Sequence, residues 1–342
     1  MFTPALQLLK KHNQSAQIDA LVMIKGVRDI YSQNPDIENV HYFNFLGEGF
    51  LKSLKYIFSL RGKYDTTINV YPSNRKEYNV INFLLGAEKR AGIKYNRSNF
   101  INLGWLNNIT IREDDSLHNV QENIRLVESL TGNTADSDPK LQLPLNDQHK
   151  EYAEKILSNS HITENDLVIG FHPGCATLKN HIKRRWEPEK FAELGRKFIE
   201  NKNAKILLFG GPDEKELKVA VSKQINSDRT MVVDAPDLLM SAAIMNRCNV
   251  FVTNDSSLMH VASALELPVV AIIGPTNTNY IHPWKTEHNI VSLHLECSPC
   301  FFYSPKPLKC TRTDIQYKCI KELSVEMVYK AASNFILNRD KI

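Results

Sequence analysis

The chain contains 342 residues, which exceeds a single ordinary hydrophobic core and predicts two domains. Its apolar content of 42% and charged content of 23% are typical of globular proteins and exclude a disordered or fibrous chain. A formal net charge of +4 is too small to indicate nucleic-acid binding. It fits an ordinary surface, and also an anionic substrate or an anionic membrane.

The sequence contains no run near the roughly 20 apolar residues of a membrane-spanning helix. Its N-terminus lacks the ordered charge, apolar run and cleavage site of a signal peptide, so we expect a cytoplasmic protein. In that compartment cysteines are reduced or bind metal rather than form disulfides. This expectation applies to Cys175, Cys248, Cys297, Cys300, Cys310 and Cys319.

Strand-like and helix-like segments alternate along the first half of the chain. Such alternation predicts an α/β domain with a parallel sheet covered by helices on both faces. A stretch rich in Gly, Asn, Asp, Ser and Pro, residues 131–148, is a candidate linker, and we place the first domain at residues 1–145. The predicted strands are 18–24, 40–43 and 66–70, and the predicted helices are 5–11, 27–32, 48–60, 76–87 and 117–130.

The alternation restarts in the second half. Two doubly wound domains in series predict a twin-Rossmann architecture with the ligand in the cleft between them. We place the second domain at residues 160–325 and a final helix at 326–342, which we expect to pack back on the first domain. The predicted strands are 167–171, 204–209, 231–233, 250–252, 269–273 and 290–293, with helices at 187–200, 213–224 and 238–247.

Residues 250–274 combine a strand, a polar turn, a helix and a second strand. Asp255, Ser256 or Ser257 can cap this helix, whose first amide hydrogens point back toward the strand end. With the positive end of the helix dipole, these amides form a site for a diphosphate. His260 follows one turn later, as either a packed core residue or a ligand contact.

Three further motifs follow the predicted strands of the second domain. Gly174, in His-Pro-Gly, lets a ligand approach the backbone or simply forms a turn. The run Lys-Arg-Arg-Trp at 183–186 neutralises a diphosphate leaving group or forms a solvated basic turn. Glu214 ends Gly-Gly-Pro-Asp-Glu, where an acidic side chain binds a ribose hydroxyl pair or starts a helix.

In this order the motifs resemble those of glycosyltransferase family 9, the ADP-heptose:lipopolysaccharide heptosyltransferases. The resemblance covers nearly the whole chain and includes Thr3-Pro4-Ala5-Leu6, which is similar to the family's first helix. Its strongest marker is the family's Asp-Thr/Ser-Gly-x-x-His turn, in which Ser257 here replaces the usual glycine. The family implies a GT-B fold, with two Rossmann-like domains facing across a cleft, and an inverting transfer without a catalytic metal or other cofactor.

The resemblance also implies roles by position. Glu214 would bind the ribose of the donor, Arg184 matches the family's phosphate-binding lysine, and Lys183 is a substitute for it. Both cations would stabilise the leaving group. The other implied donor-binding residues are Gly174, Asp255, Ser256, Ser257, Leu258 and His260.

The family's general base is an aspartate in a Gly-Asp turn, which follows the first strand and precedes the Thr-Pro-Ala-Leu helix. The sequence begins at Met1-Phe2-Thr3-Pro4 without that strand and turn, and neither Asp19 nor Asp29 matches it. Three explanations stay open: a start assigned at an internal methionine, a shortened gene product, and a binding homologue that has lost catalysis.

A cysteine cluster lies near the C-terminus. The spacing Cys-x2-Cys-x9-Cys-x8-Cys of Cys297, Cys300, Cys310 and Cys319 is able to close a structural zinc or iron site in an irregular segment. It is not a standard zinc-finger spacing, and buried or spare thiols are the alternative. Autotransporter heptosyltransferases of the same family look similar in carrying a C-terminal cysteine cluster that holds a metal.

The sequence thus predicts a cytoplasmic GT-B glycosyltransferase at the inner face of the cytoplasmic membrane. It would transfer heptose from an ADP-activated donor to a lipopolysaccharide core or a related glycan, and no nucleic-acid partner is expected. The alternatives are a catalytically inactive nucleotide-sugar-binding homologue and a twin-Rossmann nucleotide-sugar epimerase, which the motif order fits less well.

Overall fold

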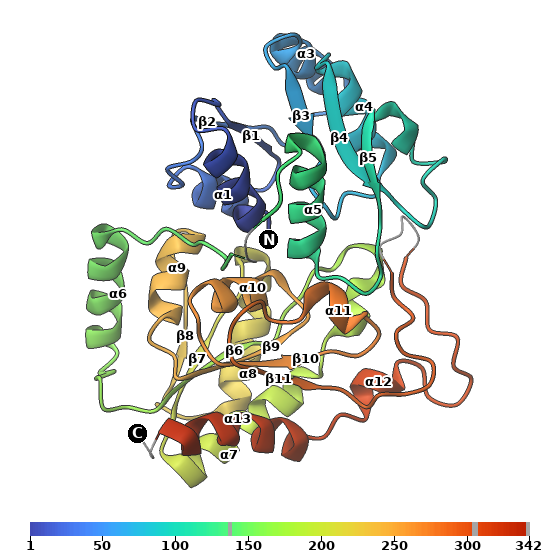
Figure 1. Ribbon diagram of the computed structural model, residues 1–342. Coiled ribbons are helices and arrows are strands. Elements are labelled where there is room, and N and C mark those ends of the chain that lie inside the picture. Colours follow the sequence, from blue (N-terminus) through green and yellow to red (C-terminus); the bar gives the residue numbers. More distant parts are fainter. Residues whose placement is uncertain (136–138, 303–306, 340–342) are drawn as a thin grey trace. The chain divides into compact units, whose positions relative to one another are not determined.

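The computed structural model describes residues 1–135, 139–302 and 307–339. The chain separates into two compact units, the first running from Met1 to Gln142 and the second beginning at Leu143 (Figure 1). Part of the predicted linker 131–148, residues 136–138, lies outside the described ranges.

A six-stranded parallel sheet forms the core of the second unit, in the order β11-β10-β9-β6-β7-β8. The direction of succession reverses between β6 and β9, which are therefore the two central strands, and all their residues are buried. Continuous apolar runs form such strands because helices cover both faces of a parallel sheet. The strands are β6 (Val168–His172), β7 (Lys205–Leu208), β8 (Thr230–Val232), β9 (Val250–Asn254), β10 (Val269–Ile272) and β11 (His288–Val291).

Helices cover this sheet in two groups (Figure 1). In one group α7 packs against α8 and α13, and in the other α9 packs against α6 and α10. The bounds are α6 (Asp147–Asn159), α7 (Pro188–Lys202), α8 (Lys215–Ile225), α9 (Leu238–Met245), α10 (Ser257–Ala264), α11 (Thr278–Ile281), α12 (Lys318–Lys321) and α13 (Val325–Arg339).

The expected packing of the C-terminal helix on the first domain stays a prediction. Within the second unit, α13 packs against α7 and the strands β9 to β11. The reason lies in its apolar spacing: Val325, Val328, Ala332 and Ile336 form one stripe and are buried in the same cluster as the strand residues.

The first unit contains two parallel sheets, β1-β2 and β3-β4-β5, where one was expected. Among the described residues β1 pairs only with β2, and β3 pairs on one side only, with β4. Side chains join the two sheets: Tyr64 Oη donates to Asp19 Oδ2 at 2.7 Å, and Leu21 packs against the cluster around Ile57 and Leu60. The elements are α1 (Thr3–His12), β1 (Asp19–Val22), α2 (Lys25–Tyr31), β2 (Asn39–Tyr42), α3 (Phe50–Leu60), β3 (Thr66–Ile68), α4 (Lys76–Leu84), β4 (Lys89–Lys94), β5 (Ile109–Arg112) and α5 (Asn119–Thr131).

A matched pair of leucine substitutions tests the assigned core of the second unit. Leu208 on β7 is fully buried, so Leu208→Ala should lower the free energy of unfolding by about 2–5 kcal/mol, the usual cost of such a cavity. Leu337 on α13 is 48% exposed, and Leu337→Ala should change it by about 0.5 kcal/mol or less. Denaturant unfolding of both variants measures the difference. Equal losses would contradict the packing described.

Candidate functional site

The carboxyl ends of β6, β7, β9 and β10 meet at one edge of the six-stranded sheet, and most of the residues predicted for the site follow these ends. The register places His172, the last residue of β6, beside Thr253 of β9. Ligands of open α/β sheets bind at this edge, where the order of the strands reverses. The reversal falls between β6 and β9, next to His172.

Glu214 is held by several donors at this edge. The two residues His172 and Glu214 approach to 2.9 Å (Nε2 to Oε2), Gly211 N donates to Oε2 at 3.1 Å, and Arg185 lies 3.5 Å from Oε1. Burial alone would raise the pKa of Glu214, but the hydrogen bonds and the nearby charges outweigh it and hold this pKa below its usual value. The carboxylate is therefore ionised at neutral pH.

Gly174 leaves space for this carboxylate. A Cβ at Gly174 would lie 1.8 Å from Glu214 Oε1, so a side chain at position 174 would displace Glu214. The structure thus brings two of the predicted residues together. It also gives Gly174 a role within the chain that its motif did not reveal.

Arg184 and Asp255 form a buried ion pair, the second pairing of predicted residues. Arg184 NH1 contacts Asp255 Oδ2, each side chain is 10% exposed, and Thr276 Oγ1 donates to the same carboxylate oxygen at 2.6 Å. The Nε atoms of Arg184 and Arg185 are buried without a hydrogen-bond partner among the described residues. Buried N–H groups normally have partners, so two unsatisfied donors on neighbouring arginines single out this place as a candidate anion site.

Two residues that the sequence did not single out complete the surroundings of Arg184. Its NH2 group lies 3.1 Å from Nδ1 of His181, and its guanidinium carbon lies 5.0 Å from the centre of the Phe301 ring. Burial, with the positive charge of Arg184, lowers the pKa of His181 to about 4. The imidazole is therefore neutral at pH 7 and accepts the hydrogen bond from the arginine.

The turn after β9 leads into α10. Ser256 Oγ lies 2.8 Å from His172 Nδ1, so His172 connects Glu214 to this turn. Ser257 is the first residue of α10, and its N-cap residue makes no side-chain capping hydrogen bond, which leaves the first amides of the helix to a ligand. In the same helix Leu258 is buried and His260, one turn in, is half-buried.

Asn254 and Trp186 fix the loops around the site. Asn254 Nδ2 donates to Pro173 O at 2.9 Å, and its Oδ1 accepts from the backbone N of Trp186 at the same distance. The Trp186 indole is fully buried and donates to Leu323 O. Trp186 thereby anchors the basic run. Lys183, next to it in sequence, is exposed and forms no ion pair within the described ranges.

The cysteine cluster does not form a recognisable metal site. The residues that the structure describes include no group of three or more His, Cys, Asp or Glu side chains that could hold a metal ion. The structural zinc or iron expected at Cys297, Cys300, Cys310 and Cys319 therefore has no support from their arrangement. Burial, with the neighbouring thiols, raises the pKa of Cys319 to about 11, so this thiol is protonated at neutral pH.

Neither Asp19 nor Asp29, the two acidic residues compared with the family's general base, is placed to act as that base. Asp19 is the first residue of β1, at the edge of the sheet opposite to the usual ligand side. Its carboxylate is already bonded to Tyr64, Asn39 and His41. Asp29 pairs with Arg28 in α2.

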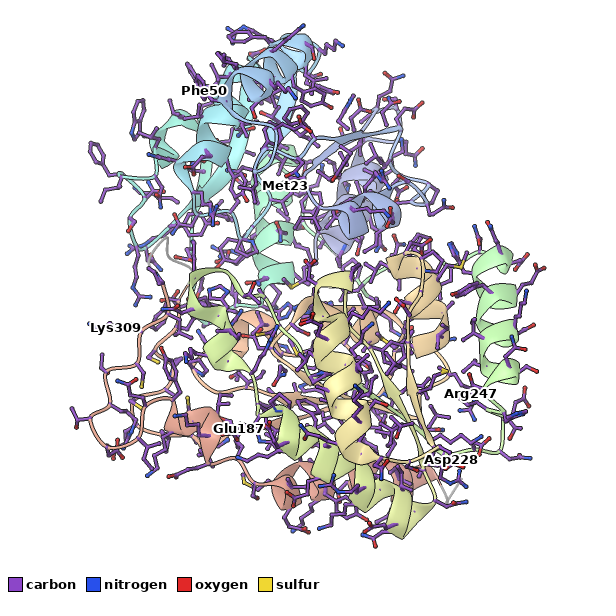
Figure 2. All side chains as sticks on the ribbon, turned by 180° about the vertical axis from the view of Figure 1, so that it is seen from behind. Met23, Phe50, Glu187, Asp228, Arg247 and Lys309 are labelled. Atoms are coloured by element: carbon purple, nitrogen blue, oxygen red, sulfur yellow. The ribbon has the colours of Figure 1, made fainter. Side chains whose placement is uncertain are left out.

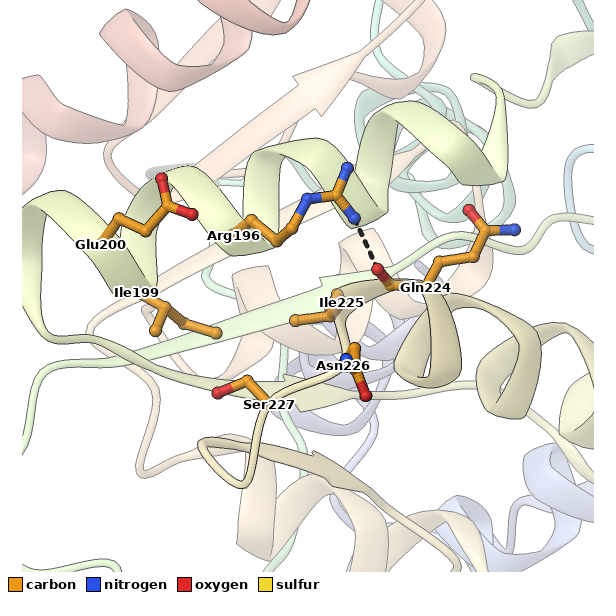
Figure 3. A pocket seen from close by; sticks show the side chains of 7 residues that line it. All are labelled: Arg196, Ile199, Glu200, Gln224, Ile225, Asn226 and Ser227. Carbon is orange, nitrogen blue, oxygen red and sulfur yellow. Dashed lines mark hydrogen bonds between the residues drawn. The ribbon is translucent and has the colours of Figure 1, made fainter.

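A surface pocket of about 390 Å³ lies away from these residues, at the C-terminal ends of α7 and α8 (Figure 3). Helices that connect parallel strands run antiparallel to them, which places this pocket at the opposite edge of the sheet. Arg196 closes part of it by donating to Gln224 O at 2.5 Å. The residues lining it are Arg196, Ile199, Glu200, Gln224, Ile225, Asn226 and Ser227.

The depressed pKa of His181 predicts a pH effect on stability. As the pH falls from 6.5 the unfolded chain takes up a proton at this residue first, so the contribution of His181 to stability should be lost between pH 6.5 and about 4. His181→Gln should flatten this part of the profile, measured by denaturant unfolding at pH 7, 5 and 4. The exposed His294, replaced by Gln, is the control that should keep the wild-type slope. An unchanged profile for His181→Gln would refute the assignment.

Comparisons with known proteins identify relatives of this chain. Lipooligosaccharide heptosyltransferase 2 of Campylobacter jejuni is 30% identical over 176 residues, 50% of this chain and 51% of that protein, so the matched part spans about half of this relative. The same-named protein of Haemophilus ducreyi is 27% identical over 300 residues, 84% of this chain and 83% of that protein.

The fold has a solved counterpart. The structure of Escherichia coli ADP-heptose LPS heptosyltransferase II matches with a TM-score of 0.74 and 20% identity, covering 99% of this chain and 95% of that one. This likeness confirms the predicted GT-B fold class. The sequence profile of glycosyltransferase family 9 (heptosyltransferase) matches residues 54–310, more than half of the chain. The chain therefore belongs to glycosyltransferase family 9.

Proposed function

We propose that this protein is a glycosyltransferase that transfers heptose, with inversion, from ADP-heptose to a lipopolysaccharide core or a related surface glycan. The observation that carries the proposal is the grouping of Glu214, Arg184 and the first amides of α10 at one sheet edge. An ionised carboxylate, a cation and free amides suit the ribose, the diphosphate and its leaving charge. The names of the relatives supply the sugar and the acceptor class.

Transfer forms a bond between an acceptor hydroxyl oxygen and the anomeric carbon of the heptose, and it breaks the bond from that carbon to the diphosphate. ADP leaves with the bonding electrons, and the proton of the hydroxyl passes to a base. The guanidinium of Arg184, which Asp255 holds in place, and the first amides of α10 are preorganised for the charge that develops on the diphosphate. Lys183, which is exposed, would act only by moving its flexible side chain toward the ligand.

The alternative of a catalytically inactive nucleotide-sugar binder gains no support from the relatives, which bear the names of transferases. A donor site would serve a binder as well as an enzyme, so turnover decides between them. Purified protein should release ADP from ADP-heptose in the presence of a heptose-accepting lipopolysaccharide core. Binding of ADP without any turnover would favour the binder.

The ribose contact provides a sharper test. Glu214→Gln should raise the KM for ADP-heptose by about 10- to 100-fold, because a hydrogen bond to a charged group contributes about 1.5–3 kcal/mol. Glu216, two residues later and exposed, offers a matched control, and Glu216→Gln should leave the KM within about twofold. Steady-state kinetics with varied donor measures both. Equal KM values for the two variants would remove Glu214 from the donor site.

We also propose that the protein works at the inner face of the cytoplasmic membrane, where a glycolipid acceptor would lie. No helix of the described ranges is long and apolar enough to cross a membrane, so the contact would be peripheral. Helix α3 of the first unit supports it. Its inner residues Ile57 and Leu60 are buried, yet Phe50 and Leu51 are each 78% exposed. Figure 2 labels Phe50 at the start of this helix.

The charges around α3 fit an anionic lipid surface. Lys52 pairs with Glu48, and Asp65 follows the segment; the other cations of residues 49–64 are Lys55, Arg61 and Lys63. A helix that is apolar on its outer face as well as its inner face usually has a partner there. Apolar side chains flanked by cations match the interface of a bilayer that contains anionic lipids.

Vesicle binding tests this surface. The double variant Phe50→Ser, Leu51→Ser should bind vesicles of mixed phosphatidylglycerol and phosphatidylcholine at least about tenfold more weakly, since each buried apolar side chain contributes about 1.5–3 kcal/mol. Met327→Ser with Leu337→Ser, two exposed apolar residues of α13, is the control that should bind normally. Cosedimentation measures both. Unchanged vesicle binding of the Phe50→Ser, Leu51→Ser variant would exclude α3 as the membrane contact. If the wild-type protein self-associates and this variant does not, the exposed face of α3 binds a second copy of the chain instead.

A further inference from the structure

The cysteine-rich segment, whose described residues are 297–302 and 307–319, contacts the candidate site, although no step described so far uses it. Its first part, residues 297–302, runs beside the loop 274–276 that follows β10. Cys300 N and Phe301 N both donate to Pro275 O, at 3.0 and 2.9 Å, and Ser298 Oγ donates to Gly274 O at 3.0 Å. Phe301 also forms an isolated parallel bridge with Thr276. The segment is therefore attached to the loop whose Thr276 donates to Asp255.

Phe301 places its ring against the cation of the site. The guanidinium carbon of Arg184 lies 5.0 Å from the ring centre, within the range of a cation–π contact. The ring of His181 meets the same ring edge-on, with centroids 5.1 Å apart and planes at 86°. Phe301 is 7% exposed and Arg184 is 8% exposed, so this contact is poorly screened by water.

A stacked guanidinium keeps its N–H groups directed outward in its own plane. With one face on Phe301, Arg184 reaches Asp255 and Thr276 through NH1 and His181 through NH2, while its Nε has no partner among the described residues. Without the ring, the flexible side chain would be held by Asp255 and His181 alone. An aromatic face at this point therefore restricts where the positive charge can lie.

We propose that Phe301 is a positioning residue for Arg184, and that the cysteine-rich segment holds Phe301 in place. This inference rests on the proposed function, in which Arg184 meets the donor diphosphate. Cys319 strengthens the attachment: a Cβ at Gly274 would lie 3.0 Å from its Sγ, so the thiol packs directly on the loop 274–276. The segment acts on the donor site through packing and stacking, and no bound metal is needed for this role.

Substitutions at Phe301 separate stacking from simple packing. Phe301→Leu keeps an apolar side chain but removes the π face, and it should lower kcat/KM about 5- to 30-fold, the range of a desolvated cation–π contact. Phe301→Tyr keeps the face and should restore activity to near the wild-type value. Phe335→Leu, the same change at a partly buried residue of α13, is the control that should stay active. Full activity of Phe301→Leu would overturn the proposal.

A double-mutant cycle identifies the partner. If Phe301 acts through Arg184, the loss from Phe301→Leu should be smaller in an Arg184→Lys background, because the lysine ammonium can still meet the ring but lacks the planar group that stacks on it. Fully additive losses in the double variant would show that Phe301 acts elsewhere, and would overturn the proposal.

Calorimetric binding distinguishes failure of this inference from failure of the proposed function. Phe301→Leu should weaken ADP binding but leave adenosine binding unchanged, because Arg184 would meet only the diphosphate. If the wild-type protein binds no ADP, the proposed function fails. If the wild-type protein binds ADP and Phe301→Leu binds it equally well, the positioning role alone is refuted.

Discussion

Parallel pairing of β6 with β9 is the constraint on which the rest of the candidate site depends. The pairing sets His172 beside Thr253, and it is reached only because α/β crossovers return every strand in the same direction. The loops after β6, β7, β9 and β10 consequently open at one edge. Side chains as far apart in sequence as His172 and Ser256, which are separated by 84 positions, contact each other there.

Two groups of oppositely charged or hydrogen-bonded side chains lie at this edge. One is Arg184 with Asp255, and the other is Glu214 with His172 and Arg185. Removing one member of a buried pair leaves an uncompensated charge, so Arg184 and Asp255 depend on each other for a stable fold. The same dependence holds between Glu214 and its donors His172 and Arg185. The candidate site is thus held in place before any ligand arrives, which reduces the reorganisation needed to bind an anionic ligand.

The positions of strands could be predicted from the sequence where an apolar strand is followed by a polar turn. The strands β6, β7, β9 and β10 were predicted within one or two residues, since each is an apolar run followed by Gly, Pro, Asp or Ser. The strands β4 and β5 were missed. Lys89, Arg90 and Lys94 occupy half of β4, and only its three central residues are buried, which hides the strand pattern.

Side-chain partnerships were harder to predict than strands. The resemblance suggested Glu214, Arg184 and Asp255, but not that Arg184 and Asp255 pair or that Gly174 makes room for Glu214. These facts depend on how loops fold back in space, and sequence spacing does not encode that. His172 and Asn254 could have been found from one signal, because both are the last residues of neighbouring central strands. His181 and Phe301 carry no comparable signal.

The division of the first unit into two small sheets has a consequence for its dynamics. Since β1 and β3 each pair on one side only within the described ranges, their amides are protected by fewer strand hydrogen bonds than those of the central strands β6 and β9. Hydrogen exchange at such strands proceeds through local opening of a few residues, whereas buried central strands exchange only when their whole sheet unfolds. The two units should therefore exchange their amide hydrogens on well-separated timescales, with the first unit opening in small parts while the sheet that carries the candidate site stays closed.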